Sequence, residues 1–545
     1  MKILAQWDAA DSQGSNPMVE VLVAQLAPLA EINPPDPALF DRTLEKRKQY
    51  IAEHIRREHL TEALRRSHLR RHAPTATLAN IQRLRETNAF LVITGQQPGI
   101  LGGPLFTFYK ILHAIILAER LTQAGTATYI PAFWNASEDH DFPEIAELWW
   151  LSKENQPVSF TWPGDPQSRR PYYHIPAREF PLDDLINYLR AHSMPTEFLE
   201  PYLSAIGDWR NGAESYPDMV DAAVWSLFPE EGLLILRPDD PFVRENARKI
   251  MEAEIDDPGS SAREVAKAGE RLRSLGLEAQ IHKREDRTAF FLVEKDQRIP
   301  LYVTGDGFEV PAGKRYSKDD LRERLERNPE SFSPSAILRP VVQDALFPTA
   351  VAVLGPNELS YHFLLSGIYA KHGVPRPSLM PRLGFTLVEP RAMRLMEKYQ
   401  LTPAALLRDP QALLKDLLRK QKNVEVASLR PDAGKSVRDY FATLLSAARD
   451  IDPTIIPVLE KNQAKILREM ENSESLLIRR EAEKNETLRA HLLSLQNAFF
   501  PGGELQERRL NVFYYLMKYG PEFLAGIKQL GKSPGIPSHS FVLIP

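Results

Sequence analysis

The stretch FLVITGQQPGILGGPLFTFYKILHAIILAERLTQAGTATYIPAFW, residues 90–134, decides the fold of this chain. Phe90–Ile93 is a short apolar run, which is typical of a strand buried on both faces. A glycine-rich segment follows, and Pro104 then leads into the apolar stretch Leu105–Leu121, which predicts a helix. Thr126–Trp134 predicts a second strand. Strand, loop, helix and strand in this order form one βαβ unit, which implies a parallel sheet with a right-handed crossover.

The same alternation of strand and helix returns further along the chain. Gly232–Arg237 is another apolar run of the buried-strand type, and we expect a helix over residues 240–253 after it. Ala350–Gly355 predicts a further strand, followed by a helix over residues 359–372. The sequence therefore predicts an α/β fold with a Rossmann-like parallel core.

Three stretches depart from this alternation. Residues 35–88 have a charged helical pattern and predict a solvated pair of helices. Residues 148–202 mix aromatic residues with prolines and short strand-like pieces (PVSFTW and PYYHIP), which indicates an insertion. Short alternating segments between residues 279 and 310 predict an antiparallel patch.

The region from about residue 390 to residue 497 has no strand signal. Leu459, Ile466, Met470 and Leu477 follow one another at spacings close to those of a coiled-coil seam. Two interpretations stay open, a long helical hairpin within one chain or a coiled-coil arm that joins two copies.

These patterns predict five divisions of the chain. They are residues 1–147 (N-terminal helices and the first part of the core), 148–230 (a first inserted region), 231–389 (the rest of the core with the antiparallel patch), 390–500 (the helical arm) and 501–545 (a C-terminal segment that packs back on the core).

Composition excludes several classes of protein. The 545 residues carry 68 Lys plus Arg against 72 Asp plus Glu, so a formal net charge of −4 gives no general attraction to nucleic acid or to an anionic membrane. The chain has no cysteine, which excludes disulfides, thiolate zinc sites and cysteine nucleophiles. Neither a signal peptide nor a membrane-spanning segment is evident, so we expect a cytoplasmic protein.

The glycine-rich turn between the first strand and its helix is the strongest local signal of a binding site. Backbone N–H groups in such a turn can approach an anion closely, and the dipole of the following helix favours negative charge. The turn is neither a Walker A loop nor a GxGxxG motif, and a tight turn with packing glycines is the alternative interpretation. The candidate binding residues here are Thr94, Gly95, Gln96, Gln97, Gly99, Gly102, Gly103, Pro104 and Lys110.

A cluster of acidic residues around a histidine directly follows the second strand. Glu138, Asp139, His140 and Asp141 lie where the carboxyl end of the strand meets the ligand-binding edge of an open α/β sheet. Carboxylates around an imidazole can ligate Mg²⁺ or zinc, or tune His140 as a general acid or base. An acidic helix start with Ser137 or Asp139 as its N-cap is the alternative.

Weaker candidates lie in three other segments. Asn357 and Glu358 follow the strand at Ala350–Gly355 in the same strand–loop–helix arrangement. Arg339 can pair with a phosphate or a carboxylate, either of a ligand or of the protein itself. Gln506 and Arg508 lie near an aromatic cluster and can either close a pocket or cap a terminal helix.

Four segments in order carry a family resemblance: TGQQPGILGGPLFTFYK, PAFWNASEDHDFPEI, ILRPVVQDALFPTAVAVLGPNELSY and PGGELQERRLNVFYYLMKYG. Together they resemble the BshC family of bacillithiol biosynthesis, whose members are described as cysteine-adding ligases. The resemblance covers nearly the whole chain. It implies a Rossmann-like core related to class I aminoacyl-tRNA synthetases, two inserted connective-peptide regions and a coiled-coil arm that dimerises.

The resemblance also implies a reaction. The carboxyl group of L-cysteine would be joined to the amine of glucosaminyl-malate, with ATP or another nucleotide activating the carboxylate and Mg²⁺ able to accompany it. His140, Asp141, Glu138 and Asp139 would then be catalytic, and no residue is assigned to a resident metal. The HxGH signature of class I synthetases is absent, and a GGPL sequence occupies the comparable position. A metal-dependent hydrolase built on residues 138–141 and a non-catalytic dimeric scaffold are the competing functions.

Overall fold

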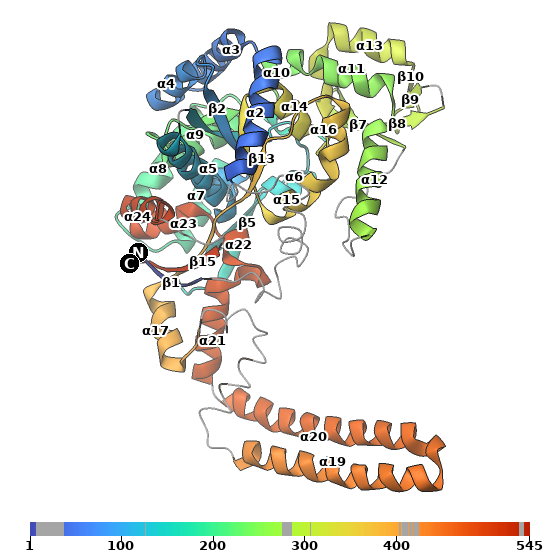
Figure 1. Ribbon diagram of the computed structural model, residues 1–545. Helices are drawn as coiled ribbons and strands as arrows, with labels where there is room; N and C mark the ends of the chain where they lie inside the picture. Colours follow the sequence, from blue (N-terminus) through green and yellow to red (C-terminus); the bar gives the residue numbers. More distant parts are fainter. Residues whose placement is uncertain are drawn as a thin grey trace. The chain divides into compact units, whose positions relative to one another are not determined.

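The computed structural model describes residues 1–6, 37–125, 127–274, 286–305, 307–402, 405, 413, 417, 425–484, 486–533 and 539–544. The chain divides into two compact units, which are shown in Figure 1. One unit contains residues 1–387 and 501–545, and the other contains residues 388–500.

A parallel sheet of five strands forms the centre of the first unit, as the sequence predicted. Its strands are β2 (Ala89–Gln96), β3 (Thr128–Asn135), β6 (Leu234–Leu236), β12 (Thr349–Leu354) and β13 (Ser378–Pro381). Every neighbouring pair is parallel, in the spatial order β13-β12-β2-β3-β6. Numbered along the chain, this order is the 3-2-1-4-5 arrangement of a Rossmann sheet, and it reverses between β2 and β12.

Both faces of this sheet are covered, which explains why β2 is apolar at consecutive positions. Leu91 and Ile93 pack on one side in the same buried cluster as Leu60 and Leu64 of α3 (Arg57–Arg70). Phe90 and Val92 point to the other side, where they join Ala114 and Leu117 of α5 (Leu105–Ala124). Gly95 and Gln96 are partly exposed at the carboxyl end of β2, where a ligand can reach them.

The remaining helices of the core flank these strands. Ahead of β2 lie α2 (Pro37–His54), α3 and α4 (Thr75–Arg83), and after β6 come α10 (Pro241–Asn246), α11 (Arg248–Asp256) and α12 (Ser260–Ser274). The later βα connections use α14 (Arg339–Leu346), α15 (Pro356–His362) and α16 (Ser366–Lys371).

The insertion between β3 and β6 is mostly helical. It contains α6 (Phe142–Ile145), the hairpin β4 (Glu147–Leu151) and β5 (Pro157–Thr161), α7 (Leu182–His192), α8 (Leu199–Asn211) and α9 (Tyr216–Leu227). The strand expected in PYYHIP is wrong, because Tyr172–His174 form a 3-10 turn between two prolines, which cannot donate to a strand ladder.

A second insertion forms an antiparallel sheet, which confirms the antiparallel patch. Its strands are β7 (Arg287–Glu294), β8 (Gln297–Thr304), β9 (Gly307–Glu309), β10 (Arg315–Tyr316) and β11 (Phe332–Pro334), in the order β10-β9-β8-β7-β11. The helix α13 (Lys318–Arg327) connects β10 to the 3-10 turn before β11. The first residues of the expected patch, 279–285, lie outside the described residues.

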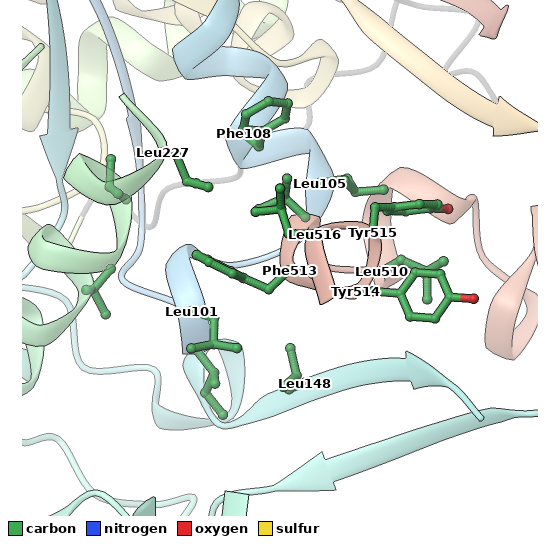
Figure 2. Close-up of a cluster of buried hydrophobic side chains, with 14 of the residues drawn as sticks. Leu101, Leu105, Phe108, Leu148, Leu227, Leu510, Phe513, Tyr514, Tyr515 and Leu516 are labelled. Carbon is green, nitrogen blue, oxygen red and sulfur yellow. The ribbon is translucent and has the colours of Figure 1, made fainter. Parts of the chain in front are cut away.

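The C-terminal segment packs on the βαβ unit. It comprises α22 (Gln506–Arg509), α23 (Val512–Tyr519), α24 (Pro521–Gly531) and β15 (His539–Leu543), which lies between β1 (Lys2–Gln6) and β14 (Gly384–Val388) in a small third sheet. Figure 2 shows the cluster that it builds: Phe513 and Leu516 of α23 lie among Leu101, Leu105 and Phe108.

Asn511, just before α23, fastens this segment to the glycine-rich turn. Its Nδ2 donates to the carbonyls of Ile100, Leu101 and Gly103, and its Oδ1 accepts from the backbone N–H of Phe513. The turn needs this support because Leu101 and the two glycines after it all have positive φ angles, between 54° and 85°.

The second unit contains the helical arm. Its helices are α17 (Pro390–Tyr399), α19 (Glu425–Ile451), α20 (Ile456–Lys484) and α21 (Glu486–Phe499). The helices α19 and α20 lie side by side as an antiparallel hairpin (Figure 1).

The inner seam of this hairpin differs from the predicted one. Leu459, Gln463, Leu467 and Met470 of α20 are half-buried, whereas Ile466 is 43% exposed. The seam therefore keeps Leu459 and Met470 of the prediction, has Leu467 in place of Ile466, and includes the polar Gln463. The side chain of Leu477, the last residue of the expected seam, lies outside those described.

Within the described ranges, no helix is both long enough and apolar enough to cross a membrane.

We expect Asn511→Ala to lower the free energy of unfolding by about 2–3 kcal/mol, because it strips buried carbonyls of their donor. Urea unfolding followed by tryptophan fluorescence measures this loss. Asn211→Ala, which removes an exposed side chain at the end of α8, is the matched control and should change stability by less than about 0.5 kcal/mol. Equal losses in the two variants would contradict the role assigned to Asn511.

Candidate functional site

A cavity of about 340 Å³ opens at the carboxyl ends of β2 and β3. It lies beside the reversal point of the sheet order, where open α/β sheets bind their ligands. Strand ends, the start of α15 and the inserted antiparallel sheet all contribute to its wall. The lining residues are Gly95, Gln96, Gln97, Trp134, Ala136, Glu138, Asp139, His140, Phe291, Arg298, Pro334, Ser335, Ala336, Ile337, Arg339, Glu358 and Tyr361.

Lys110 supports the floor of this cavity from behind. Its Nζ donates to the carbonyl of Gly95 and to Oε1 of Gln96, and it lies 2.6 Å from Oε2 of Glu358. The side chain is 1% exposed, and burial lowers the pKa of Lys110 against the opposing effect of Glu358. Lys110 therefore ties the end of β2 to the start of α15 and is not among the residues that line the cavity.

The glycine-rich turn contributes only its first residues to the cavity. Gly95, Gln96 and Gln97 line it, whereas Gly99, Gly102, Gly103 and Pro104 do not. A Cβ on Gly99 would approach the Cα of Gly103 to 2.8 Å, so this glycine is needed for packing within the turn. The hydroxyl of Thr94 is occupied by the carbonyl of Val353, across the β2–β12 pair.

The start of α5 is also closed. The backbone N–H of Leu105 donates to the carbonyl of Leu510 at 2.7 Å, and Asn511 holds the turn in front of it. The first N–H at the expected anion site is therefore occupied by the C-terminal segment, and Gly102 and Gly103 provide the positive φ angles of the turn.

Glu138 is the most deeply buried carboxylate of the acidic cluster. It accepts from the hydroxyl of Ser333 at 2.9 Å, and its Oε2 lies 3.3 Å from Nη1 of Arg244. Such pairing compensates for taking a carboxylate out of water. The helix expected to start at Ser137 or Asp139 instead starts at Phe142, with Asp141 at its N-cap, so that alternative is wrong in position.

Asp139 and His140 share a single guanidinium. Nη1 of Arg298 lies 3.0 Å from Oδ1 of Asp139 and 3.2 Å from Nδ1 of His140. Burial alone would raise the pKa of Asp139, but its contacts with the side chain and the backbone N–H of His140 and the charge of Arg298 outweigh it and lower that pKa to about 2. Asp139 is therefore ionised at neutral pH.

Arg298 is the main charged residue of the cavity that the sequence interpretation missed. It comes from β8 of the second insertion, 158 residues after His140. The one available signal was an arginine within an otherwise apolar strand segment, RIPLYV, since a buried arginine needs partners.

The rim of the cavity is acidic. Gln97 donates to Oε2 of Glu144 at 2.6 Å and lies 3.5 Å from Oδ2 of Asp139. Partial burial, together with the charges of Asp139 and Asp141, raises the pKa of Glu144 to about 7. The side chain of Asp141 is exposed, and its backbone carbonyl accepts from the hydroxyl of Tyr172.

Arg339 is the second guanidinium of the cavity. It stands at the start of α14, 6.0 Å from the ring centre of Trp134, and donates to Oε1 of Gln343 and to the hydroxyl of Tyr361. Both of these partners are uncharged at neutral pH, since burial raises the pKa of Tyr361.

Three of the other four weak candidates lie apart from the cavity. Asn357 and Arg508 are exposed and are not lining residues. Gln506 is buried and pairs through both ends of its amide with the backbone of Leu387, so it serves the third sheet. Glu358 is the one candidate of this group that reaches the cavity, and it also accepts from the backbone N–H of Gly355.

The acidic cluster does not converge on a common point. In the part of the chain that the structure describes, no group of three or more His, Asp and Glu side chains is arranged to hold a metal ion. Glu138 and Asp139 instead turn to different guanidinium groups.

Comparison with known proteins identifies two adjacent family domains. The family model described as "Bacillithiol biosynthesis BshC, N-terminal Rossmann-like domain" matches residues 21–383. The model described as "Bacillithiol biosynthesis BshC, C-terminal coiled-coil domain" matches residues 385–543.

Relatives match over most of their length. A protein of Thermus thermophilus is 34% identical over 481 residues, which are 85% of this chain and 90% of the relative. A protein of Salinibacter ruber is 31% identical over 455 residues, which are 83% of this chain and 82% of the relative. Both carry the name "Putative cysteine ligase BshC".

Among solved structures, methionyl-tRNA synthetase of Mycobacterium tuberculosis in complex with methionyl-adenylate aligns with 83% of this chain and 95% of its own. The identity is 10% and the TM-score 0.23. The fold assignment therefore rests on the strand order and on the family models, and the relation to synthetases stays a prediction.

We expect Lys110→Met to destabilise the fold by about 3 kcal/mol, because it leaves the Glu358 carboxylate and the Gly95 carbonyl without their buried donor. Adding Glu358→Gln should recover part of this loss, since the unpaired charge is then gone. Urea unfolding of both variants gives the comparison. Lys267→Met breaks the exposed pair with Glu264 and should cost less than about 1 kcal/mol. If the double variant lost as much stability as the two single variants added together, the interaction between Lys110 and Glu358 would not be the cause of the loss.

We expect the stabilising effect of the Asp139 charge to vanish in acid. Its folded pKa of about 2 lies below the ordinary value of 3.8, so the contribution is present above about pH 4 and is lost as the pH falls toward 2. Its size at neutral pH is about 1–2 kcal/mol, given that the side chain is 31% exposed. Urea unfolding of the wild type and of Asp139→Asn at several pH values should show the difference in stability between them shrinking from about pH 4 toward pH 2. A gap independent of pH would contradict this assignment.

Proposed function

The chain belongs to the BshC family of bacillithiol biosynthesis, and on that premise we propose that it is a ligase that forms an amide between the carboxyl group of L-cysteine and the amine of glucosaminyl-malate. The carboxylate is activated by a nucleotide before the amine attacks it. Amide formation needs this activation, because a free carboxylate does not acylate an amine at neutral pH.

The observation that carries the proposal is Arg339. It lines the cavity, it donates to Gln343 and Tyr361, which are uncharged at neutral pH, and the nearby carboxylate of Glu358 is paired with Lys110, so we expect its positive charge to meet an incoming anion. A guanidinium presents a planar fork that matches a carboxylate or a phosphate. Arg298, by contrast, already faces Asp139.

The closed start of α5 changes where phosphate oxygens are expected to bind. The first N–H of α5 donates to the carbonyl of Leu510 and is not open to a ligand. We therefore expect the negative charge of ATP or of an acyl phosphate to bind at the side of the cavity that Arg339 lines. A volume of about 340 Å³ is near the lower end for small-molecule sites, which span roughly 300–1,000 Å³. It suits the reacting carboxyl and amine ends, with the rest of the nucleotide and the sugar extending beyond it.

Selection of cysteine has to work without a thiolate zinc site, because the chain contains no cysteine. Trp134, Phe291 and Ile337 form an apolar part of the cavity wall, against which a small thiol side chain can pack. Recognition then depends on size and packing, so serine, which differs from cysteine by one atom, is the critical competitor.

The arm supports a dimeric enzyme. Ile466 lies on α20 outside the inner seam of the hairpin and is 43% exposed, so it is available to a helix of a second copy. A cytoplasmic location agrees with the need for ATP. Neither nucleic acid nor a membrane is required by this reaction.

We expect the purified protein to form bacillithiol from L-cysteine, glucosaminyl-malate, ATP and Mg²⁺, with release of AMP or ADP detected by mass spectrometry. Arg339→Met should raise the KM of the anionic substrate that it binds by at least about tenfold, since a charge-assisted hydrogen bond contributes about 1.5–3 kcal/mol. His140→Ala should lower kcat about 10²-fold or more.

Arg315→Met, at the exposed edge of the second insertion, is the matched control and should retain full activity. Two results would overturn the proposal. One is folded protein that binds neither the nucleotide nor either substrate. The other is metal-dependent hydrolysis of glucosaminyl-malate without ATP, which is the result that the competing hydrolase function requires.

A further inference from the structure

The contact with Arg298 indicates which ring nitrogen of His140 carries the hydrogen. A guanidinium can only donate, so the 3.2 Å contact between Nη1 of Arg298 and Nδ1 of His140 makes Nδ1 the acceptor. An imidazole that accepts at Nδ1 carries its hydrogen at Nε2. The ring is then neutral and is a donor at its other nitrogen.

Asp139 does not reverse this assignment. Its Oδ1 lies 3.4 Å from Nδ1 of His140, whereas it lies 3.0 Å from Arg298 and 2.9 Å from the backbone N–H of His140. A hydrogen on Nδ1 would also point toward the N–H groups of Arg298. The two short contacts therefore satisfy Asp139 and leave Nδ1 to the arginine.

Arg298 is itself held rigidly, which makes it able to orient the ring. Its Nε donates to the hydroxyl of Ser333 at 2.9 Å, and its Nη2 donates to the carbonyl of Pro334. Its guanidinium carbon lies 4.2 Å from the ring centre of Phe291, and that same ring packs edge-on against His140. The inserted sheet thus fixes both the hydrogen bond and the tilt of the imidazole.

We propose that Arg298 is a positioning residue that keeps His140 in its neutral Nε2–H form, and that His140 acts in the cavity as a hydrogen-bond donor to the acyl oxygen and not as a general base. This rests on the proposed function for the identity of the acyl group. With Nδ1 turned to Arg298, Nε2–H is the polar atom that the ring has left to offer to a ligand. A neutral N–H aimed at an oxygen that gains charge stabilises the transition state.

The step balances without a proton moving to His140. The free amine attacks the acyl carbon of the nucleotide-activated cysteine, a C–N bond forms, and the carbonyl electron pair moves to the oxygen that His140 contacts. That pair then re-forms the C=O bond and expels the phosphate or the nucleoside monophosphate. The proton of the amine nitrogen leaves to water.

The tautomer can be tested without any substrate. In protein labelled with ¹⁵N-histidine, the His140 signals are those that disappear in His140→Gln. We expect them to show a pyridine-type Nδ1 without hydrogen and a pyrrole-type Nε2 with its attached hydrogen. Arg298→Ala should shift that signal toward a mixture of tautomers, and Arg298→Lys, which restores one donor, should reverse part of the shift. A wild-type spectrum with the hydrogen on Nδ1 overturns the proposal even if neither arginine variant folds.

The role of the N–H is tested by two amide substitutions. The side-chain nitrogen of Gln can occupy the place of Nε2, whereas that of Asn reaches only the place of Nδ1. We expect His140→Gln to retain at least about tenfold more kcat than His140→Asn, with similar KM values. If His140 were a general base, both amides would be equally inactive, and that result rejects the donor role.

These two tests separate the possible failures. Absence of product from the wild type would refute the proposed function, while the ¹⁵N spectrum would still decide the placement of the proton. Arg315→Ala, in the same inserted sheet but 78% exposed, should change neither the spectrum nor the rate.

Discussion

The closure of the glycine-rich turn by the C-terminal segment constrains the rest of the site. Leu101 and the two glycines after it adopt left-handed backbone angles, a conformation that costs roughly 1–2 kcal/mol for a residue such as leucine. The turn is nevertheless held, because Asn511 donates to three of its carbonyls although it lies 408 to 411 residues away in the chain. The same contact brings the carbonyl of Leu510 onto the first N–H of α5. A helix start that would otherwise attract an anion is thereby used for folding.

Charge at the site is consequently carried by side chains, and most of the buried charges there are paired because burying an unpaired ion is costly. Glu138 and Asp139 each face a guanidinium, and Lys110 faces Glu358, since an unpaired buried ion would be far more costly than a paired one. Pairing partly neutralises these groups toward a ligand. Arg339 differs because it donates to the uncharged Gln343 and Tyr361, while the nearby carboxylate of Glu358 is already paired with Lys110, so we expect Arg339 to meet an anionic substrate.

The sequence predicted the parallel core because its information is local: a run such as Phe90–Ile93 must be covered on both faces, and the turn and helix after it leave only a parallel return. The same reasoning located His140 and Glu138 at the carboxyl edge of the sheet, where the cavity lies. It did not reveal that Gly102 and Lys110 lie outside the lining of the cavity, because only tertiary packing decides whether a turn faces a ligand or the C-terminal segment. The seam of α20 differs from the predicted one at one position for a related reason, since Leu467 is half-buried where Ile466 was expected.

What sequence reasoning could least provide is the position of a proton. The types and order of Glu138, Asp139 and His140 fit a general base, a general acid or a metal ligand equally well. The choice depends on which nitrogen of the ring meets a donor, and that donor, Arg298, comes from an insertion 158 residues later. Arg298 reaches His140 only because β8 pairs with β7 and because Ser333 and Pro334 of β11 hold its other nitrogens. The chemistry open to His140 is therefore set by the antiparallel insertion, although the residue itself follows a strand of the parallel core.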